Sequence, residues 1–340
     1  MHYYFTERMT NIENVMTQVV FEPLPKRITY LDSILFIGSC FSENIAKRMS
    51  ERKFQSLTNP HGILFDTFSI ESCLKDIISL KSYSEEDLFQ YNEIYHSWNH
   101  HSSFSHIDKN IAVQNINETI KVSEQYLKKT NHIVITLGSA FSYYHIASKK
   151  FVANCHKVAQ KEFEKKLATI AEISNSLESI YTMIKALNSN AQIIITISPV
   201  RHLREGVINN NRSKARLIEA VHQFQDNHSD VYYFPSYELV IDCLRDYRFY
   251  DIDFAHPNIQ ATNIVFDYFT RYCIDNSEKE HLEKFYQLHL ATKHRSRFPQ
   301  TNAHKAFLKK YLTLCIGYKT QFSHLDFDEE IHFFQEELCS

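Results

Sequence analysis

The chain of 340 residues is 44% hydrophobic and 23% charged, enough to bury the core of one large domain or roughly two domains. Its formal net charge of −3 and the lack of long Lys/Arg runs argue against nucleic acid or an anionic membrane as a partner. No apolar stretch approaches the roughly 18 residues of a membrane span, and residues 1–15 lack a signal-peptide core, so we expect a cytoplasmic protein.

Apolar, strand-like runs alternate with helical patterns along the chain. We expect strands at residues 33–38, 132–138, 191–198 and 231–235. We expect helices at residues 42–53, 67–80, 112–129, 161–188, 213–227, 236–246 and 258–274. Because the strands are uniformly apolar and long helices separate them, the pattern predicts an α/β protein with a mostly parallel sheet covered on both faces.

Three segments depart from this alternation. Residues 141–154 contain two short aromatic runs and predict a β-hairpin, whereas residues 201–212 are polar without periodicity and predict a long loop. From residue 276 onward the pattern is helical and rich in His, Lys and aromatic residues. We expect a C-terminal helical appendage, residues 276–340, that packs on the main domain or forms the contact of a homodimer.

Glycine is scarce, which makes its positions informative. The chain has only five glycines, against roughly 24 at an average usage of about 7%. Gly38, Gly62 and Gly138 each follow or interrupt a strand-like run. Glycine permits positive φ and close backbone approach, so we expect these three to line one pocket together. Each of them is also explained, taken singly, as an ordinary turn glycine.

Two potential nucleophiles stand where the first strand meets a helix. Ser39 and Cys40 follow the apolar run SILFIG, and residues 44–49 carry apolar side chains at helical spacing. Such a junction holds a side chain at the carboxyl edge of the sheet and directs the helix N-terminus toward it. The alternative is structural, with Ser39 as the helix N-cap and Cys40 as a small buried apolar residue.

A possible acid–base pair follows the last predicted strand. Asp253 and His256 stand three residues apart in DIDFAHPN. Nucleophilic catalysis needs a base near the nucleophile and a carboxylate that fixes the tautomer of that base. Nucleophile, acid and base in this chain order also occur in hydrolases built on parallel sheets. With 19 histidines and 40 acidic residues, the spacing alone is weak evidence.

The sequence resembles the GSCFA-domain family, a branch of the SGNH (GDSL-like) hydrolase superfamily. Ordered motifs spread over roughly residues 20–310 support this resemblance. They are GSCFS at 38–42, NPHGI at 59–63, ITLGSAFSYY at 135–144, ANCHK at 153–157, SPVRH at 198–202, RSKA at 212–215, YFPSYE at 233–238, LRDYRFY at 244–250 and DFAHP at 253–257. The resemblance implies a three-layer α/β/α, flavodoxin-like domain at residues 20–275, followed by the helical extension at 276–340.

The resemblance also implies site roles. When the first superfamily block is aligned with GSCFS, Cys40 falls at the nucleophile position and Ser39 falls where an Asp usually stands. The resemblance therefore favours Cys40 over Ser39 as the nucleophile. Gly62 matches the glycine whose N–H donates to the oxyanion. The third block, Gly-x-Asn, reads Gly138-Ser139-Ala140, so its Asn is missing. Asn154 is our candidate substitute, and His156 either lines the same pocket or lies on the hairpin surface.

Arg201 and His202 leave the third predicted strand and are candidates for holding an anionic substrate group. An equally good alternative for them is a structural salt bridge, for example to Asp246 or Glu238. The seven cysteines form no CxxC pair, which indicates reduced thiols and no zinc knuckle. No cofactor motif is present, and His96, His100, His101 and His106 lack a recognised ligand spacing, so we expect no cofactor, no metal and a His-rich surface loop.

These observations favour acyl transfer. Cys40 or Ser39 would attack an ester carbonyl, His256 would move the proton, and Asp253 would orient His256. With water as the acceptor, we expect an esterase that acts on O-acetylated carbohydrate or another small ester. With a sugar hydroxyl as the acceptor, we expect an acyltransferase. A catalytically inactive module that binds a glycan or an acyl group is the alternative from a different class.

Overall fold

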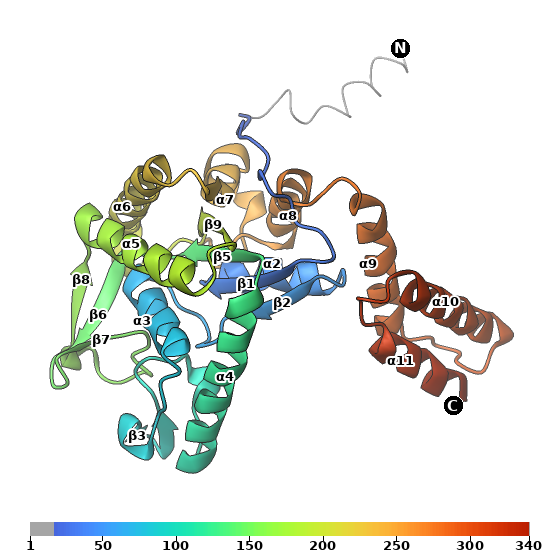
Figure 1. The fold of residues 1–340 in the computed structure, drawn as a ribbon, viewed down its shortest axis with the longest axis horizontal. Helices are drawn as coiled ribbons and strands as arrows, with labels where there is room; N and C mark the ends of the chain where they lie inside the picture. The colour runs from blue at the N-terminus through green and yellow to red at the C-terminus, as the bar shows by residue number, and fades with distance from the viewer. Residues whose placement is uncertain (1–16, 340) are drawn as a thin grey trace.

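The computed structural model describes residues 17–339, so the stretch searched for a signal peptide, residues 1–15, lies outside it. Its centre is a five-stranded sheet in which every neighbouring pair is parallel (Figure 1). The strand order is β10-β9-β5-β1-β2. The strands are β1 (Ser33–Gly38), β2 (Gln55–Thr58), β5 (His132–Leu137), β9 (Gln192–Ile197) and β10 (Val231–Phe234). This is the flavodoxin-like order, so the predicted fold class is confirmed.

Helices cover both faces of the sheet and form two separate cores. On one face, α2 (Cys40–Ser50) and α8 (Ile259–Cys273) pack against side chains such as Ile34, Phe36 and Val134. On the other face lie α3 (Thr67–Ile78), α5 (Ile170–Leu187), α6 (Gly206–Asn227) and the end of α4 (Lys109–Lys129). Both faces of each inner strand are therefore buried, which explains why the strand sequences are apolar without alternation.

Two small antiparallel sheets lie outside the main sheet. The first pairs β3 (Phe89–Tyr91) with β4 (Ile94–His96). The second has the order β7-β6-β8 and contains β6 (Phe141–His145), β7 (Lys150–Val152) and β8 (Phe163–Leu167). The hairpin predicted for 141–154 is confirmed. The helix predicted for 161–188 was wrong at its start, because residues 163–167 alternate in burial as a strand and Thr169 caps α5.

Three other predictions need correction. The edge strand β2 was not predicted, since QSLT is short and largely polar. The loop predicted for 201–212 is helical from Gly206 onward, where α6 begins. The helix predicted for 236–246 is one short turn, α7 (Ser236–Glu238), followed by a π-helical turn at Leu239–Cys243. Propensity within a short window does not resolve these boundaries, which depend on packing against the sheet.

The C-terminal region is helical, as predicted, and contains α9 (Lys279–Lys293), α10 (Asn302–Gln321) and α11 (Asp328–Cys339) (Figure 1). Phe285 of α9 is fully buried and connects the two parts of the chain. Its ring centroid lies 5.2 Å from that of Tyr30 and 5.3 Å from that of Phe327. These helices therefore share a core with the segment that precedes β1.

Within residues 17–339, no helix combines the length and the apolar character that crossing a bilayer requires.

Gly38 sets how closely β1 approaches β5. Its φ is +134°, and a Cβ added there would lie 2.2 Å from the Thr136 carbonyl oxygen. The backbone of the neighbouring strand leaves no room for a side chain, so this glycine is required by sterics.

We predict that Gly38→Ala lowers the free energy of unfolding by at least about 2 kcal/mol, because it combines a disfavoured φ with a backbone clash. Urea denaturation measures this. Gly317→Ala is the matched control, since a Cβ at that helical position meets nothing within 4 Å. The control should be neutral or stabilising by up to about 1 kcal/mol. Equal stability of Gly38→Ala and wild type would contradict the steric argument.

We predict that Phe285→Ala lowers the free energy of unfolding by about 3–5 kcal/mol, because it leaves a cavity in the core shared by α9 and the segment before β1. Phe298→Ala is the comparison, since that ring is 71% exposed and its loss should change stability by less than about 0.5 kcal/mol. Similar unfolding midpoints for the two variants would show that the C-terminal helices do not stabilise the sheet domain.

Candidate active site

Ser39 and Cys40 lie at the carboxyl end of β1, where α2 begins. Ser39 occupies the N-cap position with an extended backbone, but its side chain makes no capping hydrogen bond. Its N–H donates to the Thr136 carbonyl oxygen of β5 at 3.1 Å, and its Oγ is buried without a partner. Cys40 is the first residue of the helix and is only partly buried. Of the two candidate nucleophiles, Cys40 is therefore the more accessible.

Neighbouring groups shift the pKa of the Cys40 thiol in opposite directions. Burial, and next the nearby Glu43 carboxylate, raise the thiol pKa above its ordinary value. The backbone N–H groups of Cys40 and Phe41, together with Lys214, act to lower the same pKa. N–H groups at a helix N-terminus favour a negative charge. Because the raising effects are larger, the resting thiol keeps its proton near neutral pH.

Asp253 and His256 form a hydrogen-bonded pair in the loop before α8. One Asp253 oxygen accepts the N–H groups of Ala255 at 2.9 Å and His256 at 3.0 Å. The other oxygen accepts the His256 Nδ1–H at 2.5 Å. These bonds, led by the backbone N–H of His256, lower the Asp253 pKa to about 2. With Nδ1 protonated, Nε2 is the free acceptor of an imidazole that is half exposed to solvent.

Arg201 ties this loop to the main sheet. Its N–H donates to the Ala255 carbonyl at 3.1 Å, and its guanidinium lies 4.3 Å from the Tyr250 ring centroid. The suggested salt bridges to Asp246 and Glu238 were wrong: Asp246 pairs with Arg248, and Glu238 accepts the Tyr233 hydroxyl. Because Arg201 follows the carboxyl end of β9, it holds the Asp253–His256 pair at the same edge of the sheet as Cys40.

His202 lies next to Gly138 at this edge. Its Nε2 is 3.3 Å from where a Gly138 Cβ would be, and its backbone N–H donates to Asn210. Burial, and next the charge of Lys214, lower the His202 pKa to about 4, so the ring is neutral at physiological pH. Within residues 17–339, no hydrogen bond connects the Cys40 thiol to His202 or His256.

The glycine N–H groups considered for the oxyanion are already bonded. The Gly62 N–H donates to the Asn59 carbonyl at 2.7 Å, and a Cβ at Gly62 would meet His101 at 2.2 Å. The N–H groups of Gly138 and Ser139 both donate to the Phe65 carbonyl. None of Gly38, Gly62 and Gly138 lines the cavity described next, so this cavity does not bear out the idea of a shared glycine pocket. Each permits a close contact instead.

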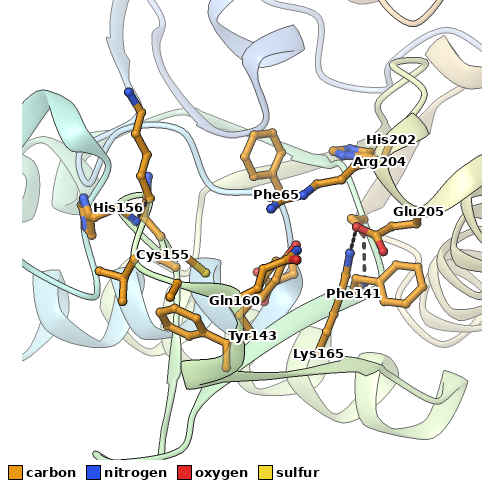
Figure 2. A pocket seen from close by; sticks show the side chains of 18 residues that line it. Phe65, Phe141, Tyr143, Cys155, His156, Gln160, Lys165, His202, Arg204 and Glu205 are labelled. Atoms are coloured by element: carbon orange, nitrogen blue, oxygen red, sulfur yellow. Dashed lines mark hydrogen bonds and ion pairs between the residues drawn. The ribbon is translucent and has the colours of Figure 1, made fainter.

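A cavity of about 730 Å³ lies beside the carboxyl edge of the sheet (Figure 2). Aromatic side chains form much of its wall, and Figure 2 shows Lys165 and Glu205 paired beside the Phe141 ring. Among the predicted residues, it is lined by Asn154, His156 and His202. Cys40, Asp253 and His256 are not part of its lining, so the candidate nucleophile and the candidate base lie outside this cavity.

Asn154 and His156 belong to one tight loop at the cavity wall. The Asn154 side-chain oxygen accepts the His156 N–H at 2.8 Å. The His156 Nε2–H donates to the Ser97 carbonyl at 2.7 Å, and the ring lies 4.5 Å from that of His96. Burial lowers the His156 pKa to about 4. His156 is therefore a buried, hydrogen-bonded side chain, and the hairpin-surface interpretation was wrong.

The His-rich segment is also more buried than predicted. His96 and His100 are 8% and 1% exposed, so the expectation of a surface loop was wrong for both. The His100 ring lies 3.9 Å from the ring of His61, which is also buried. Within residues 17–339, no group of three or more His, Cys, Asp and Glu side chains is arranged to hold a metal ion.

Sequence reasoning missed Lys214. This residue of α6 is 1% exposed, and its Nζ donates to the carbonyl oxygens of Gly138 and Ser198, each at 2.6 Å. Burial lowers its pKa to about 7. A signal was present, because Lys214 falls at helical spacing among the buried residues Asn210, Leu217 and Val221, and a lysine at such a position is rarely there for packing alone.

Comparison with known proteins places the chain in a family. Residues 33–269 match the GSCFA family, and residues 286–339 match the family described as GSCFA domain protein, C-terminal domain. No curated protein matches. Among solved structures, an acetyl xylan esterase (Est2A) from the rumen bacterium Butyrivibrio proteoclasticus is similar at 12% identity, with a TM-score of 0.37. That match covers 72% of this chain and 65% of that chain. The GSCFA match at residues 33–269 spans well over half of this chain, so the chain belongs to the GSCFA family.

Proposed function

We propose that this protein is an acyl-ester hydrolase with Cys40 as its nucleophile. The observation that carries the proposal is the Asp253–His256 pair, held by Arg201 at the edge of the sheet where Cys40 begins α2. A carboxylate that fixes Nδ1–H leaves Nε2 as the base, which is the arrangement that nucleophilic catalysis needs.

The proposed steps are those of acyl transfer. The Cys40 S–H bond breaks, its proton passes to His256 Nε2, and Sγ forms a bond to the ester carbonyl carbon. The alcohol leaves with the proton from His256, which gives a thioester. Water then attacks the thioester, releases the acid and restores the thiol. Cys40 is the first residue of α2, so its N–H has no acceptor within the helix, and this group is the proposed donor to the oxyanion.

The cavity suggests the substrate class. Its walls combine the rings of Phe65, Phe141, Tyr143 and Phe163 with the polar side chains of Asn154 and Gln160. Apolar walls with a few polar groups suit a sugar ring or another small organic group. We propose an O-acetylated carbohydrate, with His202 between the sugar and the reacting ester. A sugar hydroxyl in place of water would make the same site an O-acyltransferase.

One observation favours a second candidate, a glycan- or acyl-binding module without catalysis. The N–H groups of Gly62 and Gly138 are both bonded to backbone carbonyls, and Ala140 stands where the superfamily has an Asn donor. An oxyanion hole that lacks one donor loses about 3 kcal/mol of transition-state stabilisation.

We predict that Cys40→Ala and His256→Ala each lower the hydrolysis of p-nitrophenyl acetate by about 100-fold or more, because each removes a reacting group. Ser39→Ala should change the rate by less than about fivefold, since Ser39 Oγ is buried and bonds to nothing. Cys243→Ala, at another partly buried thiol, is the matched control. Wild-type activity equal to that of Cys40→Ala would favour the binding module, and loss with Ser39→Ala alone would make Ser39 the nucleophile.

We predict that Asp253→Asn lowers kcat by roughly tenfold or more, because an amide no longer fixes the imidazole with Nδ1 protonated. The Asp253 pKa of about 2 means that its carboxylate stays ionised above about pH 4, so this residue should contribute no ionisation to the pH–rate profile at higher pH. Asp251→Asn, at an exposed carboxylate of the same loop, is the control. Equal rates for both variants would remove Asp253 from the mechanism.

A further inference from the structure

The segment that follows β9 forms one wall of the cavity and carries an arginine that the proposed steps do not use. His202, Arg204 and Glu205 all line the cavity. The Asn210 side-chain oxygen accepts the His202 N–H at 2.9 Å. The Asn209 side-chain amide donates to the Glu205 carbonyl at 3.2 Å. Because the backbone is bonded on either side of Arg204, this residue has a fixed position in the wall.

The Arg204 guanidinium faces the cavity without a partner among residues 17–339. No ion pair or hydrogen bond joins it to any of these residues, and the neighbouring Glu205 carboxylate is paired with Lys165 of β8. Figure 2 shows the Arg204 side chain directed from beside His202 toward Phe65. A guanidinium stays charged at physiological pH and presents five N–H donors, so Arg204 has its whole donor set free for a ligand.

The carboxylates in the cavity lining are not free to pair with Arg204. They belong to Asp66 and Glu205. One Asp66 oxygen accepts the Ser69 N–H at 3.0 Å, and the other accepts the Ser69 hydroxyl at 2.7 Å. The Glu205 carboxylate holds Lys165. Both carboxylates therefore already have partners within the protein.

The remaining titratable groups leave the lining with an excess of positive charge. His156 and His202 are neutral at physiological pH, because burial lowers the pKa of each to about 4. Burial raises the pKa of the Cys155 thiol to about 11, and the charge of Arg204 acts against this rise. Lys157 also lines the cavity, and it pairs with no carboxylate in the described part of the chain.

We propose that Arg204 binds an anionic group of the substrate, a carboxylate or a phosphate, so that this site takes an acidic sugar. This rests on the proposed function, in which the cavity holds the sugar part of an ester. A guanidinium forms two parallel N–H···O bonds to either kind of anion. The rings of Phe141 and Phe163 in the same wall offer an apolar surface to the sugar ring. The volume of about 730 Å³ suits such a ligand.

The test compares three simple sugars. Ligand-observed NMR titration of the whole chain gives the dissociation constants of glucuronate, glucose 6-phosphate and glucose. At least one of the two anionic sugars should bind about tenfold or more tightly than glucose, because a hydrogen bond between ionised groups is stronger than one between neutral groups. The tighter of the two identifies the anion as a carboxylate or a phosphate. Equal dissociation constants for all three sugars would overturn the proposal.

Substitutions assign the preference to Arg204. Arg204→Met should weaken binding of the preferred anionic sugar by about tenfold, to the level of glucose. The side chain is exposed, so this variant should fold. Arg204→Lys keeps the charge without the planar fork and should retain part of the preference. Arg212→Met is the matched control, since it removes the same charge from α6 outside the cavity lining. A preference that persists in Arg204→Met, or is lost equally in Arg212→Met, would contradict the assignment.

Two partly buried thiols report where the sugar binds. Cys155 lines the cavity, whereas Cys243 does not. A saturating concentration of the preferred sugar should slow alkylation of Cys155 by iodoacetamide severalfold and leave Cys243 unchanged, as measured by mass spectrometry of the two peptides. Unchanged alkylation of Cys155 would mean that the sugar binds elsewhere, and the proposal would fail.

None of these measurements needs ester turnover. A wild type that hydrolyses no ester but prefers an anionic sugar through Arg204 would overturn the esterase proposal and leave the acidic-sugar site in place. An active esterase without this preference would overturn the present inference alone.

Discussion

The close approach of β1 and β5 at Gly38 is the contact on which the site depends. With no Cβ at this position, the Thr136 carbonyl comes near enough for the N–H of Ser39 to donate to it, and α2 begins one residue later. A side chain at Gly38 would push the two strands apart at the point where the chain turns from strand to helix. The helix N-terminus would then no longer be held at the carboxyl edge of the sheet, where parallel α/β proteins form their sites.

The same edge collects charged and polar groups from distant parts of the chain. Arg201 and His202 leave β9, Asp253 and His256 come from the loop before α8, and Lys214 reaches the strand ends from α6. The backbone carbonyls of Gly138 and Ser198, just past two strand ends, have no further partner in the ladder, so they accept the N–H groups of Lys214 Nζ. The unpaired ends of the sheet thereby fix the side chains around Cys40.

Burial divides these groups by protonation state. His156 and His202 are neutral because their rings are largely removed from water, and the resting Cys40 thiol keeps its proton for the same reason. Asp253 stays ionised because three N–H groups point at its two oxygens. The exposed pair therefore joins an ionised carboxylate to an imidazole, while the buried groups shape the cavity and the environment of the thiol.

The sequence by itself determined the fold class and which short segments could carry chemistry. Uniformly apolar strands such as SILFIG and HIVITL are stable only when both faces of a sheet are covered, and the Asp-x-x-His spacing closes a local hydrogen bond within one loop.

The tertiary structure alone decided which groups meet across the chain. Lys214, 174 residues after Cys40, reaches the same strand ends only because α6 packs its buried face on the sheet. The Gly138 N–H is taken by the Phe65 carbonyl, and β8 forms within a segment of helical composition, because partners distant in sequence supply the hydrogen bonds. The local sequence pattern determines the secondary-structure propensity of a segment, whereas long-range pairing and burial determine which groups it finally contacts.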